Sequence, residues 1–403
     1  MHRKSFLTGL AACAGLALTG LPAIAQEGEP IKIGEINHYK RMAAFAEPYK
    51  KGIDMAVEEI NEAGGVMGRP LEFVYRDDQG EPGEAIKIAE ELMTREGTVM
   101  LTGSILSNVG LAIASLAGNR EWVYLAAEPL ADAVTWEQGN PWTFRLRAST
   151  YMQAAMLAEA AAETDATTYA TIAPNYAYGK DAVAAFKEVL TELKPDVEFV
   201  AEQWPALFGI DAGAEVQAIE RAKPDAIYNV TFGPDLAKFV REGNTRGLFE
   251  DREVYGLLSG EPEYMEPLGG EAPEGWTVTG YPWYDFEGDA NAEFVTAYQE
   301  RWDETPKIGS LVGYATAQSI AAALEKAGST ESDAIRQAFE GLEVATPAGE
   351  IVYREIDNQS TLGAWVGTTA LEDGQGVMVD WDYKDGADYL PDDDAVRELR
   401  PSE

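Results

Sequence analysis

The chain alternates short apolar strands with amphipathic helical segments. Residues 31–36 alternate apolar and polar side chains as a half-buried strand does, and residues 49–60 repeat apolar side chains at helical spacing. Further strands are expected at 71–75 and 99–101, with a helix over 83–93 between them. This β-α-β-α-β order is typical of a parallel sheet with helices on its faces.

The same order of elements returns in the second part of the chain. We expect alternating strands and helices at residues 168–173, 181–193, 197–201, 212–222 and 226–230. The sequence therefore predicts an α/β protein with two Rossmann-like lobes, each built on a parallel sheet. Ligands of such sheets bind beyond the carboxyl ends of the strands, so the residues just after each strand are the first candidates for a site.

Three stretches predict points where the chain passes from one lobe to the other. They are residues 144–147, residues 278–284 and, after an expected helix at 314–327, residues 345–349. From these crossings we expect a first lobe of residues 26–145 plus 282–345, a second lobe of residues 146–281 plus 346–385, and an acidic C-terminal tail over 386–403. We assign the tail no role in binding.

The first residues predict export from the cytoplasm. A basic start is followed by an apolar run over 5–21 and by the small side chains of Ala23 and Ala25, so residues 1–25 are expected to be a signal peptide cleaved after Ala25. A lipoprotein box ending at Cys13 is the alternative, but the apolar core before it is shorter than the ~7 residues usually needed. No second apolar stretch of ~18 residues follows, so we expect a periplasmic protein without a membrane span after cleavage.

The charge of the chain excludes whole classes of partner and site. Its 403 residues contain 31 Lys and Arg against 69 Asp and Glu, a formal net charge of -38. Nucleic acid is excluded as a partner because phosphate backbones are bound by clustered cations, and self-repulsion of this size favours a monomer. One Cys and two His exclude disulfide frameworks and Cys-rich metal sites, so we expect neither a metal nor a cofactor.

The common enzyme motifs are missing from the sequence. No Gly-x-Gly-x-x-Gly follows the first strand, no phosphate loop ends in Gly-Lys-Ser/Thr, and no Gly-x-Ser-x-Gly elbow is present. We therefore expect a binding protein rather than an enzyme. An exported enzyme that acts on a small molecule stays open as the alternative from another class.

Three polar residues follow strands of the first repeat. Ser107 and Asn108 open an apolar helix, whose free N–H groups suit a carboxylate, although either residue is also a good helix cap. Glu128 follows the apolar run at 123–127 and either pairs with an ammonium group or faces water. The first lobe thus offers candidates for both ends of a zwitterion.

The second repeat contributes aromatic residues and a further carboxylate. Tyr178 and Phe232 stand at matching strand ends, where they wall a pocket or pack at the lobe interface. Glu261 stands in Leu257-Leu258-Ser259-Gly260-Glu261, after a further apolar strand, and is a second candidate partner for an amine. Trp283 lies in an expected crossing, where it either covers a ligand or packs the hinge.

With its motifs taken together, the chain resembles the Leu/Ile/Val-binding family of periplasmic substrate-binding proteins of ABC importers. The motifs that carry the resemblance are Ile31-Lys32-Ile33-Gly34, the run GIDMAVEEINEAGGVMG at 52–68, Arg76-Asp77-Asp78-Gln79, residues 103–114, Tyr178-Gly179, residues 222–226 and residues 314–319. The resemblance implies the type I periplasmic binding fold, with two lobes and three crossings that close on a small ligand. It also implies an inner-membrane ABC permease as partner.

The resemblance implies roles for single residues. Ser107 resembles the family serine that binds the α-carboxylate of the ligand, Tyr178 resembles the tyrosine of the second lobe, and Phe45 falls where the family has an aromatic at the cleft edge. Where branched-chain amino-acid binders carry a small residue and then Thr, this chain has Glu128 and Leu130. Amino-acid specificity is less firmly implied there.

The acidic partner for the ligand amine aligns with Ser259 or, after a short shift, with Glu261, and both stay open. We expect a receptor for an amino acid, branched-chain or otherwise apolar, that delivers it to the permease. An aromatic carboxylate, an amide or urea is the alternative ligand within the same class of receptor.

The net charge leads to a test of salt dependence. We expect the melting temperature to rise by several degrees between about 0.1 M and about 1 M NaCl, because the added salt shortens the range of repulsion between surface carboxylates. Scanning calorimetry measures this rise. At about pH 4, where many carboxyls carry a proton, the same salt step should have much less effect, and an unchanged melting temperature at neutral pH would contradict the idea.

Overall fold

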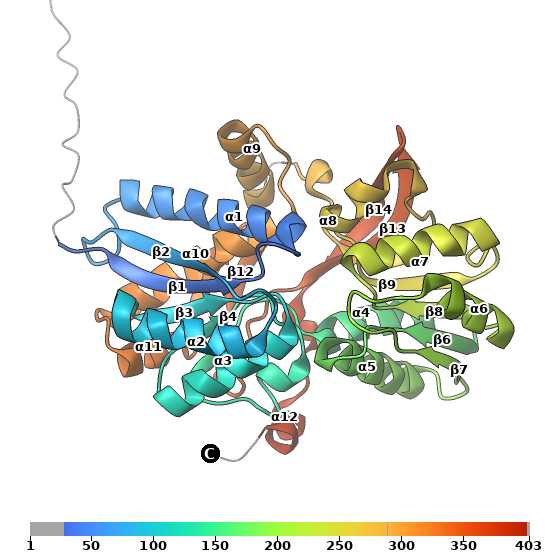
Figure 1. Ribbon diagram of the computed structural model, residues 1–403, viewed down its shortest axis with the longest axis horizontal. Coiled ribbons are helices and arrows are strands. Elements are labelled where there is room, and N and C mark those ends of the chain that lie inside the picture. The colour runs from blue at the N-terminus through green and yellow to red at the C-terminus, as the bar shows by residue number, and fades with distance from the viewer. Residues whose placement is uncertain (1–27, 288, 401–403) are drawn as a thin grey trace, which may run out of the picture.

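Two α/β lobes lie side by side in the computed structural model, which describes residues 28–287 and 289–400 (Figure 1). The first lobe carries the blue, cyan and orange segments and the second the green and yellow ones, with connecting segments between them. The expected signal peptide at 1–25, its cleavage site and Cys13 lie outside the described residues. Over the described part of the chain, no helix is both long and apolar enough to cross a membrane.

The first lobe is built on a five-stranded parallel sheet in the order β2-β1-β3-β4-β5. Its strands are β1 (Ile31–Asn37), β2 (Leu71–Asp77), β3 (Met100–Gly103), β4 (Tyr124–Ala126) and β5 (Thr143–Arg145). The helices of this lobe are α1 (Ala43–Glu62), α2 (Pro82–Glu91), α3 (Ser107–Arg120), α9 (Ala290–Trp302), α10 (Ile308–Ala327) and α11 (Ser332–Phe339), with short helical turns η1 (Leu92–Glu96) and η2 (Asp132–Val134).

The second lobe is built on a seven-stranded sheet in the order β14-β13-β10-β9-β8-β6-β7. The parallel part comprises β6 (Thr168–Ile172), β7 (Glu198–Gln203), β8 (Ala226–Asn229), β9 (Glu253–Gly260) and β10 (Thr277–Gly280). An antiparallel hairpin, β13 (Ala364–Glu372) and β14 (Gln375–Lys384), extends it. Its helices are α4 (Thr150–Ala162), α5 (Ala177–Leu193), α6 (Ala212–Ala222), α7 (Gly233–Arg246) and α8 (Pro262–Met265), with turns η3 (Glu266–Glu271), η4 (Trp283–Asp285) and η5 (Gly386–Tyr389).

The predicted fold class is confirmed. Strands β1, β2, β3, β6, β7 and β8 each fall within two residues of the segments expected from apolar patterning. In the inner strands most side chains are buried where the sheet faces its helices; Ile31, Ile33 and Ile36 of β1, for example, are fully buried. Helix α10 begins at Ile308, six residues before the expected start, because residues 308–313 contain glycines that weaken the helical pattern.

The first and third passages between the lobes run beside each other. The Arg145 N–H donates to the Asn358 carbonyl at 2.9 Å, and the Ser360 N–H donates to the Arg145 carbonyl at 2.9 Å. Arg145 is fully buried and braces this passage through the Leu130 and Ala131 carbonyls. The chain returns to the first lobe after β10.

The third passage lies later in the chain than expected. At residues 345–349 the structure has the turn of a hairpin formed by β11 (Glu343–Thr346) and β12 (Gly349–Val352). Pro347 enters this turn, Thr346 Oγ1 accepts the Ala348 N–H at 3.2 Å, and Gly349 has a φ of +106°. The Pro and Gly that suggested a linker therefore form a tight turn. Strand β11 packs on α10, so residues 346–352 lie with the first lobe rather than the second.

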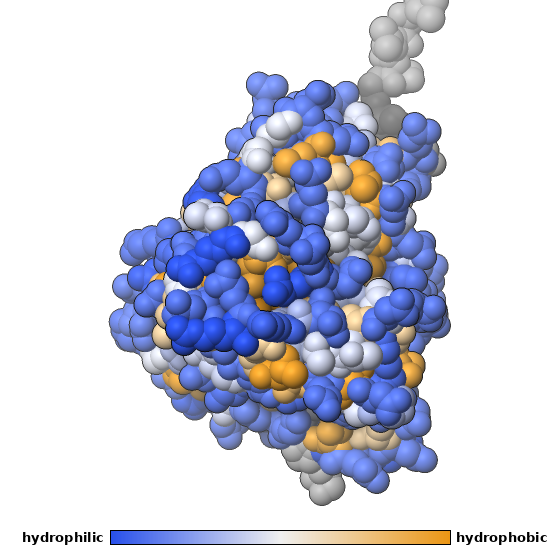
Figure 2. Space-filling view, turned by 90° about the vertical axis from the view of Figure 1, so that its right-hand side faces the viewer, coloured by the Kyte–Doolittle hydropathy of each residue, from blue (hydrophilic) through white to orange (hydrophobic). Residues whose placement is uncertain are grey.

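The acidic C-terminal segment is structured over its described part. Helix α12 (Asp393–Leu399) begins after Asp392, whose side chain caps it, and Val396 is fully buried. The Pro391 carbonyl accepts a hydrogen bond from Arg354 at 3.0 Å. The rest of this segment is mostly exposed, as expected for its charge. On the second-lobe face, hydrophilic residues cover most of the surface and hydrophobic ones form small separate groups (Figure 2).

Helices α1 and α10 approach closely through glycines. A Cβ on Gly313 would overlap the Tyr49 carbonyl oxygen, and a Cβ on Gly52 would overlap the Ser310 carbonyl oxygen. Neither glycine position therefore has room for a side chain, and the backbones of α1 and α10 are in direct contact.

The close approach predicts a steric effect at Gly313. We expect Gly313→Ala to lower the free energy of unfolding by about 1 to 3 kcal/mol or more, because helix α10 must shift away from α1 to admit a methyl group. Urea unfolding followed by circular dichroism measures the change. Gly83→Ala in α2 is the matched control, since no atom lies within 4 Å of its added Cβ; equal effects at both sites would contradict the packing argument.

Candidate functional site

A cavity of about 320 Å³, including its mouth, lies between the two lobes. Side chains from both lobes line it, at the carboxyl ends of the parallel strands and the starts of the helices that follow. The lining residues are Phe45, Ile105, Ser107, Glu128, Leu130, Arg147, Tyr176, Tyr178, Phe232, Leu258 and Tyr264. The position agrees with the rule that parallel α/β sheets bind ligands beyond their strand ends.

The structure brings together most of the predicted site residues. Five of them line this cavity: Phe45, Ser107, Glu128, Tyr178 and Phe232. The other three, Asn108, Glu261 and Trp283, do not. Their roles as ligand contacts therefore stay predictions.

The cavity wall from the first lobe is set by the turn between β3 and α3. Gly103 has a φ of +105° and Ser104 a φ of +65°, and this left-handed turn directs the start of α3 toward the second lobe. Leu106 precedes α3 without capping it by a side chain, so the first N–H groups of the helix have no intrahelical partner. Ser107 Oγ accepts the Ala131 N–H at 3.2 Å, which leaves its own O–H free to donate.

Three charged side chains form a buried triad at one side of the cavity. Arg147 lies between the carboxylates of Glu128, which follows β4, and Glu261, which follows β9. Its Nη1 donates to Glu128 Oε2 at 2.7 Å, and its Nη2 donates to Glu261 Oε1. The three side chains are 8 %, 2 % and 2 % exposed, so the triad joins the lobes where water is largely excluded.

Each carboxylate of the triad keeps one oxygen without a partner. Glu128 Oε1 and Glu261 Oε2 are buried and accept no hydrogen bond from the protein. Burial raises the pKa of both carboxyls to about 7, and the neighbouring Arg147 guanidinium opposes this rise. Glu128 faces the cavity, so its free oxygen is a ready acceptor for a donor group of a ligand.

Glu261 is directed to the hinge side of the triad. It lines a second cavity, shared with Arg147 and with Trp365 near the passages between lobes. The neighbouring Glu263 accepts the Gly309 N–H of α10 at 2.8 Å, and burial raises the pKa of its carboxyl to about 8. Glu261 thus holds Arg147 in place from the second lobe, whereas the sequence suggested contact with an amine.

The predicted alternatives beside Glu261 lie outside the ligand cavity. Ser259 Oγ accepts Asn229 Nδ2 at 3.2 Å and is buried within the sheet. Trp283 contacts Tyr284 edge-on at 5.5 Å and lines a different hollow with Tyr281, next to β14. Asn108 follows Ser107 in α3 and does not line the cavity, and its Oδ1 is buried without a hydrogen-bond partner. Hinge packing describes Trp283 better than ligand contact.

Aromatic rings of the second lobe form the apolar wall. Tyr178 meets Phe232 edge to face at 5.5 Å, and Tyr176 and Tyr264 extend this cluster. The Tyr178 hydroxyl is buried without a partner. Phe45 of α1 lines the cavity from the first lobe. The cavity therefore combines a polar end with an apolar body.

The loop between β1 and α1 reaches across the mouth of the cleft. The Arg41 guanidinium lies over the Phe208 ring of the second lobe at 5.5 Å, and Phe208 contacts Phe232. Lys40 pairs with Asp77 at 3.4 Å. Neither cation lines the cavity. Instead, the loop bridges the two lobes.

Six lining residues were not among the predicted contacts: Ile105, Leu130, Arg147, Tyr176, Leu258 and Tyr264. Tyr176 stood two residues before Tyr178 in the sequence, and that spacing was the available signal. Leu258 has a φ of +63° within β9, a local strain that the sequence does not reveal. Arg147 lies in the crossing expected at residues 144–147, and it also lines the cavity.

Comparison with known families matches nearly the whole described chain. A family model described as periplasmic binding protein matches residues 30–375. The leucine-, isoleucine-, valine-, threonine-, and alanine-binding protein of Pseudomonas aeruginosa is 23% identical over 85% of this chain and 90% of its own. An amino acid binding protein of the same organism is 24% identical over 97% of this chain and 100% of its own.

Solved structures share the fold. A solute binding protein of an ABC transporter from Rhodopseudomonas palustris, in complex with 3,4-dihydroxy benzoic acid, has a TM-score of 0.79 and 22% identity, covering 89% of this chain and 98% of its own. An ABC-type branched-chain amino acid transporter protein from Rhodopseudomonas palustris has a TM-score of 0.71 and 24% identity, covering 88% and 96%. At these identities the likeness describes the fold.

The triad predicts a pH-dependent cost of removing its cation. The folded protein holds protons on Glu128 and Glu261 that the unfolded chain releases, because their folded pKa of about 7 exceeds the ordinary 4.5. Their contribution to stability therefore falls as pH rises from 4.5 to about 7. In a variant without Arg147 this loss of stability with rising pH is larger, because no cation remains beside the two buried carboxylates.

We expect Arg147→Met to lower the free energy of unfolding by about 3 to 5 kcal/mol at about pH 8, and by less at about pH 5, where both carboxyls take up protons. Urea unfolding at the two pH values measures the difference. Arg120→Met breaks an exposed pair with Glu90 and should cost about 0 to 1 kcal/mol at either pH. A loss for Arg147→Met that is the same at both pH values would count against the triad.

Proposed function

The chain belongs to the periplasmic binding protein family, a family of solute receptors rather than enzymes, and from this premise we propose that it captures an amino acid with an apolar side chain. The chain is a solute-binding protein of the ABC transporter type, and its family acts outside the cytoplasm. In the proposal, an α-amino acid is enclosed between the lobes and passed unchanged to a membrane permease. The single observation that carries the choice of ligand is the free, buried oxygen of Glu128.

The carboxylate of the ligand is bound at the start of α3. Ser107 offers a free O–H there, beside N–H groups of the first helical turn. The helix dipole adds a partial positive charge at the same point. An anion in this position satisfies donors that closure would otherwise leave buried without partners.

The ammonium group of the ligand is bound by Glu128. Its Oε2 is occupied by Arg147, whereas Oε1 is buried and free. A cation at this oxygen lowers the cost of burying the Glu128 charge, which now raises the pKa of that carboxyl to about 7. The Tyr178 hydroxyl, also without a partner, is a second polar group for the same end of the ligand.

The side chain of the ligand lies against the apolar wall. Phe232 and Tyr264 from the second lobe and Ile105, Leu130 and Phe45 from the first provide that surface. Burying a branched aliphatic side chain there contributes roughly 1.5 to 3 kcal/mol. Apolar amino acids are thereby favoured over polar ones.

An aromatic carboxylate is the second candidate. The observation in its favour is the set of aromatic rings around the cavity together with Arg147, a cation that lines it. In this case the ring of a benzoate-like ligand packs among the tyrosine rings, and Glu128 keeps Arg147 as its only partner. The two ligand classes differ in one respect: the amino acid uses Glu128 Oε1 and the aromatic acid leaves it unpaired.

Titration calorimetry with a panel of ligands separates the candidates. We expect tight binding of Leu, Ile or Val, with binding reduced by at least about tenfold for leucinamide, which lacks the carboxylate, and for 4-methylpentanoate, which lacks the amine. Binding of benzoate or 4-hydroxybenzoate with none of the amino acids would overturn the amino-acid choice.

Variants of the cavity give an independent test. We expect Ser107→Ala to weaken binding of the preferred amino acid by about tenfold or more, and Glu128→Gln to do the same while sparing any aromatic acid that binds. Ser115→Ala, an exposed position on the same helix, is the matched control and should bind as the unaltered protein does. Unchanged affinity in both cavity variants would contradict the proposal.

A further inference from the structure

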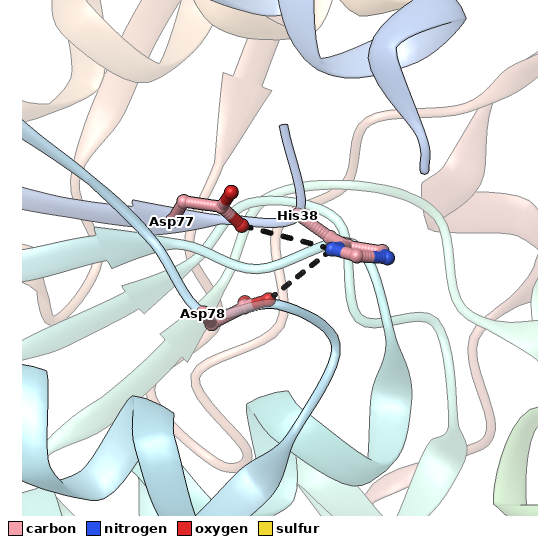
Figure 3. Close-up of side chains that lie close together, drawn as sticks. All are labelled: His38, Asp77 and Asp78. Atoms are coloured by element: carbon pink, nitrogen blue, oxygen red, sulfur yellow. Dashed lines mark ion pairs between the residues drawn. The ribbon is translucent and has the colours of Figure 1, made fainter. Parts of the chain in front are cut away.

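A histidine and two aspartates meet at the carboxyl edge of the first sheet, outside the ligand cavity. His38 follows β1, Asp77 ends β2 and Asp78 follows it, so two neighbouring strands bring the three side chains together (Figure 3). Their candidate ligand atoms all lie within 4.8 Å of one another. None of the three residues lines the cavity between the lobes.

The imidazole points its free nitrogen at both carboxylates. His38 Nδ1 lies 3.8 Å from Asp77 Oδ1 and 3.8 Å from Asp78 Oδ1, as Figure 3 shows. These distances are too long for hydrogen bonds. Nδ1 is buried and has no hydrogen-bond partner, and the His38 side chain is 7 % exposed. A buried polar atom without a hydrogen-bond partner, directed between two carboxylate oxygens, is unusual unless an ion or a water molecule binds between the three atoms.

Backbone groups orient the two carboxylates. The Gln79 N–H donates to Asp77 Oδ1 at 2.9 Å, and the Gly80 N–H donates to Asp78 Oδ1 at 2.7 Å. Such hydrogen bonds fix the direction of carboxylates that bind metals. Gly80 has a φ of +76° and lies close to the His38 ring, where an added Cβ would be 3.2 Å from Nε2. The turn after β2 is therefore shaped around this cluster.

The charge of the cluster is only partly balanced. Asp78 is 1 % exposed, so its charge is buried. Lys40 pairs with Asp77 Oδ2 at 3.4 Å, but its side chain is 76 % exposed and contacts the outer oxygen. Arg41, the other nearby cation, lies over Phe208.

We propose that His38 Nδ1, Asp77 and Asp78 bind one divalent transition-metal ion, with Zn²⁺ as the best match and water completing the coordination. One imidazole nitrogen and two carboxylate oxygens are a donor set that Zn²⁺ accepts at about 2.0 to 2.2 Å. His38 Nδ1 lies 3.8 Å from each carboxylate oxygen, so an ion placed between the three donor atoms is close to this metal–ligand distance from each of them. Ca²⁺ takes roughly six to eight oxygen ligands and fits an imidazole poorly.

The ion joins two loops of the first lobe. His38 begins the segment that continues to Lys40 and Arg41, and Arg41 reaches the second lobe across the cleft mouth. Asp77 and Asp78 belong to the turn between β2 and α2. The metal ties the bridging loop to the end of β2, and it binds independently of the ligand in the cavity.

Calorimetric titration with Zn²⁺, after treatment with a chelator, tests the site in the full chain. A protein with 69 acidic residues also binds cations weakly at its surface, so the variants decide the result. His38→Leu removes the nitrogen ligand without changing the charge of a neutral histidine. Asp77→Asn removes one carboxylate at a position whose side chain is 23 % exposed, where folding is easily retained.

We expect one tight Zn²⁺ site in the unaltered protein and at least about tenfold weaker binding in both His38→Leu and Asp77→Asn. The double variant Asp393→Asn/Asp394→Asn, on the exposed face of α12, removes two charges elsewhere and should bind as the unaltered protein does. Circular dichroism checks that each variant is folded. Should His38→Leu fail to fold, Asp77→Asn carries the test.

Co²⁺ provides a second readout, because its visible absorption bands become much stronger when the ion leaves octahedral coordination by water for a four- or five-coordinate protein site. We expect these bands in the unaltered protein and their loss in His38→Leu. Absence of a tight site, equal weakening in the α12 control, or Ca²⁺ binding as tightly as Zn²⁺ would each overturn the proposal. Amino-acid binding is measured separately, so failure of the metal site leaves the proposed receptor function untouched.

Discussion

The placement of one arginine between two glutamates constrains much of this structure. Arg147 lies in the first passage between lobes, Glu128 comes from the first lobe and Glu261 from the second. Three charges buried together are costly unless all stay paired, so the triad is satisfied only when both lobes are in place around it. The same triad forms one side of the ligand cavity. The buried charges that connect the two lobes therefore also select the ligand. A bound ligand must pair with the carboxylate oxygen that Arg147 leaves without a partner.

Most of the fold could be predicted from the sequence because its physical causes are local. Buried parallel strands require continuous apolar runs, and the helices between them require a 3.6-residue period, so patterning located β1 to β3 and β6 to β8. The third passage was misplaced because Pro347 and Gly349 favour a hairpin turn as strongly as a linker. The antiparallel strands β13 and β14 were not expected, and the buried Val396 was missed because the acidic composition of residues 386–403 suggested exposure.

The site was partly predictable for a related reason. Ser107, Glu128, Tyr178 and Phe232 each lie within six residues of the end of a strand, and topology alone brings strand ends to one edge. Glu261 follows a strand as well, yet its side chain is turned toward Arg147, and only the partner decides that. Arg147, Leu258 and Tyr264 depend on how the lobes meet, which no local pattern encodes. The cluster of His38, Asp77 and Asp78 was likewise hidden, because its donors come from separate strands and a count of Cys and His does not register carboxylates.

The glycine contact between α1 and α10 bears on the order in which the chain assembles during synthesis. Helix α1 lies near the amino terminus, whereas Gly313, on which it packs, emerges from the ribosome more than 250 residues later than Tyr49. The second lobe, apart from its last hairpin, is contiguous from α4 to β10 and depends on no such distant partner. The first lobe therefore waits for a late segment of the chain, and the apolar face of α1 stays unburied while most of the second lobe is already able to collapse. A chain with this order of assembly stays open to chaperones, and to export in an extended state, until its synthesis is nearly complete.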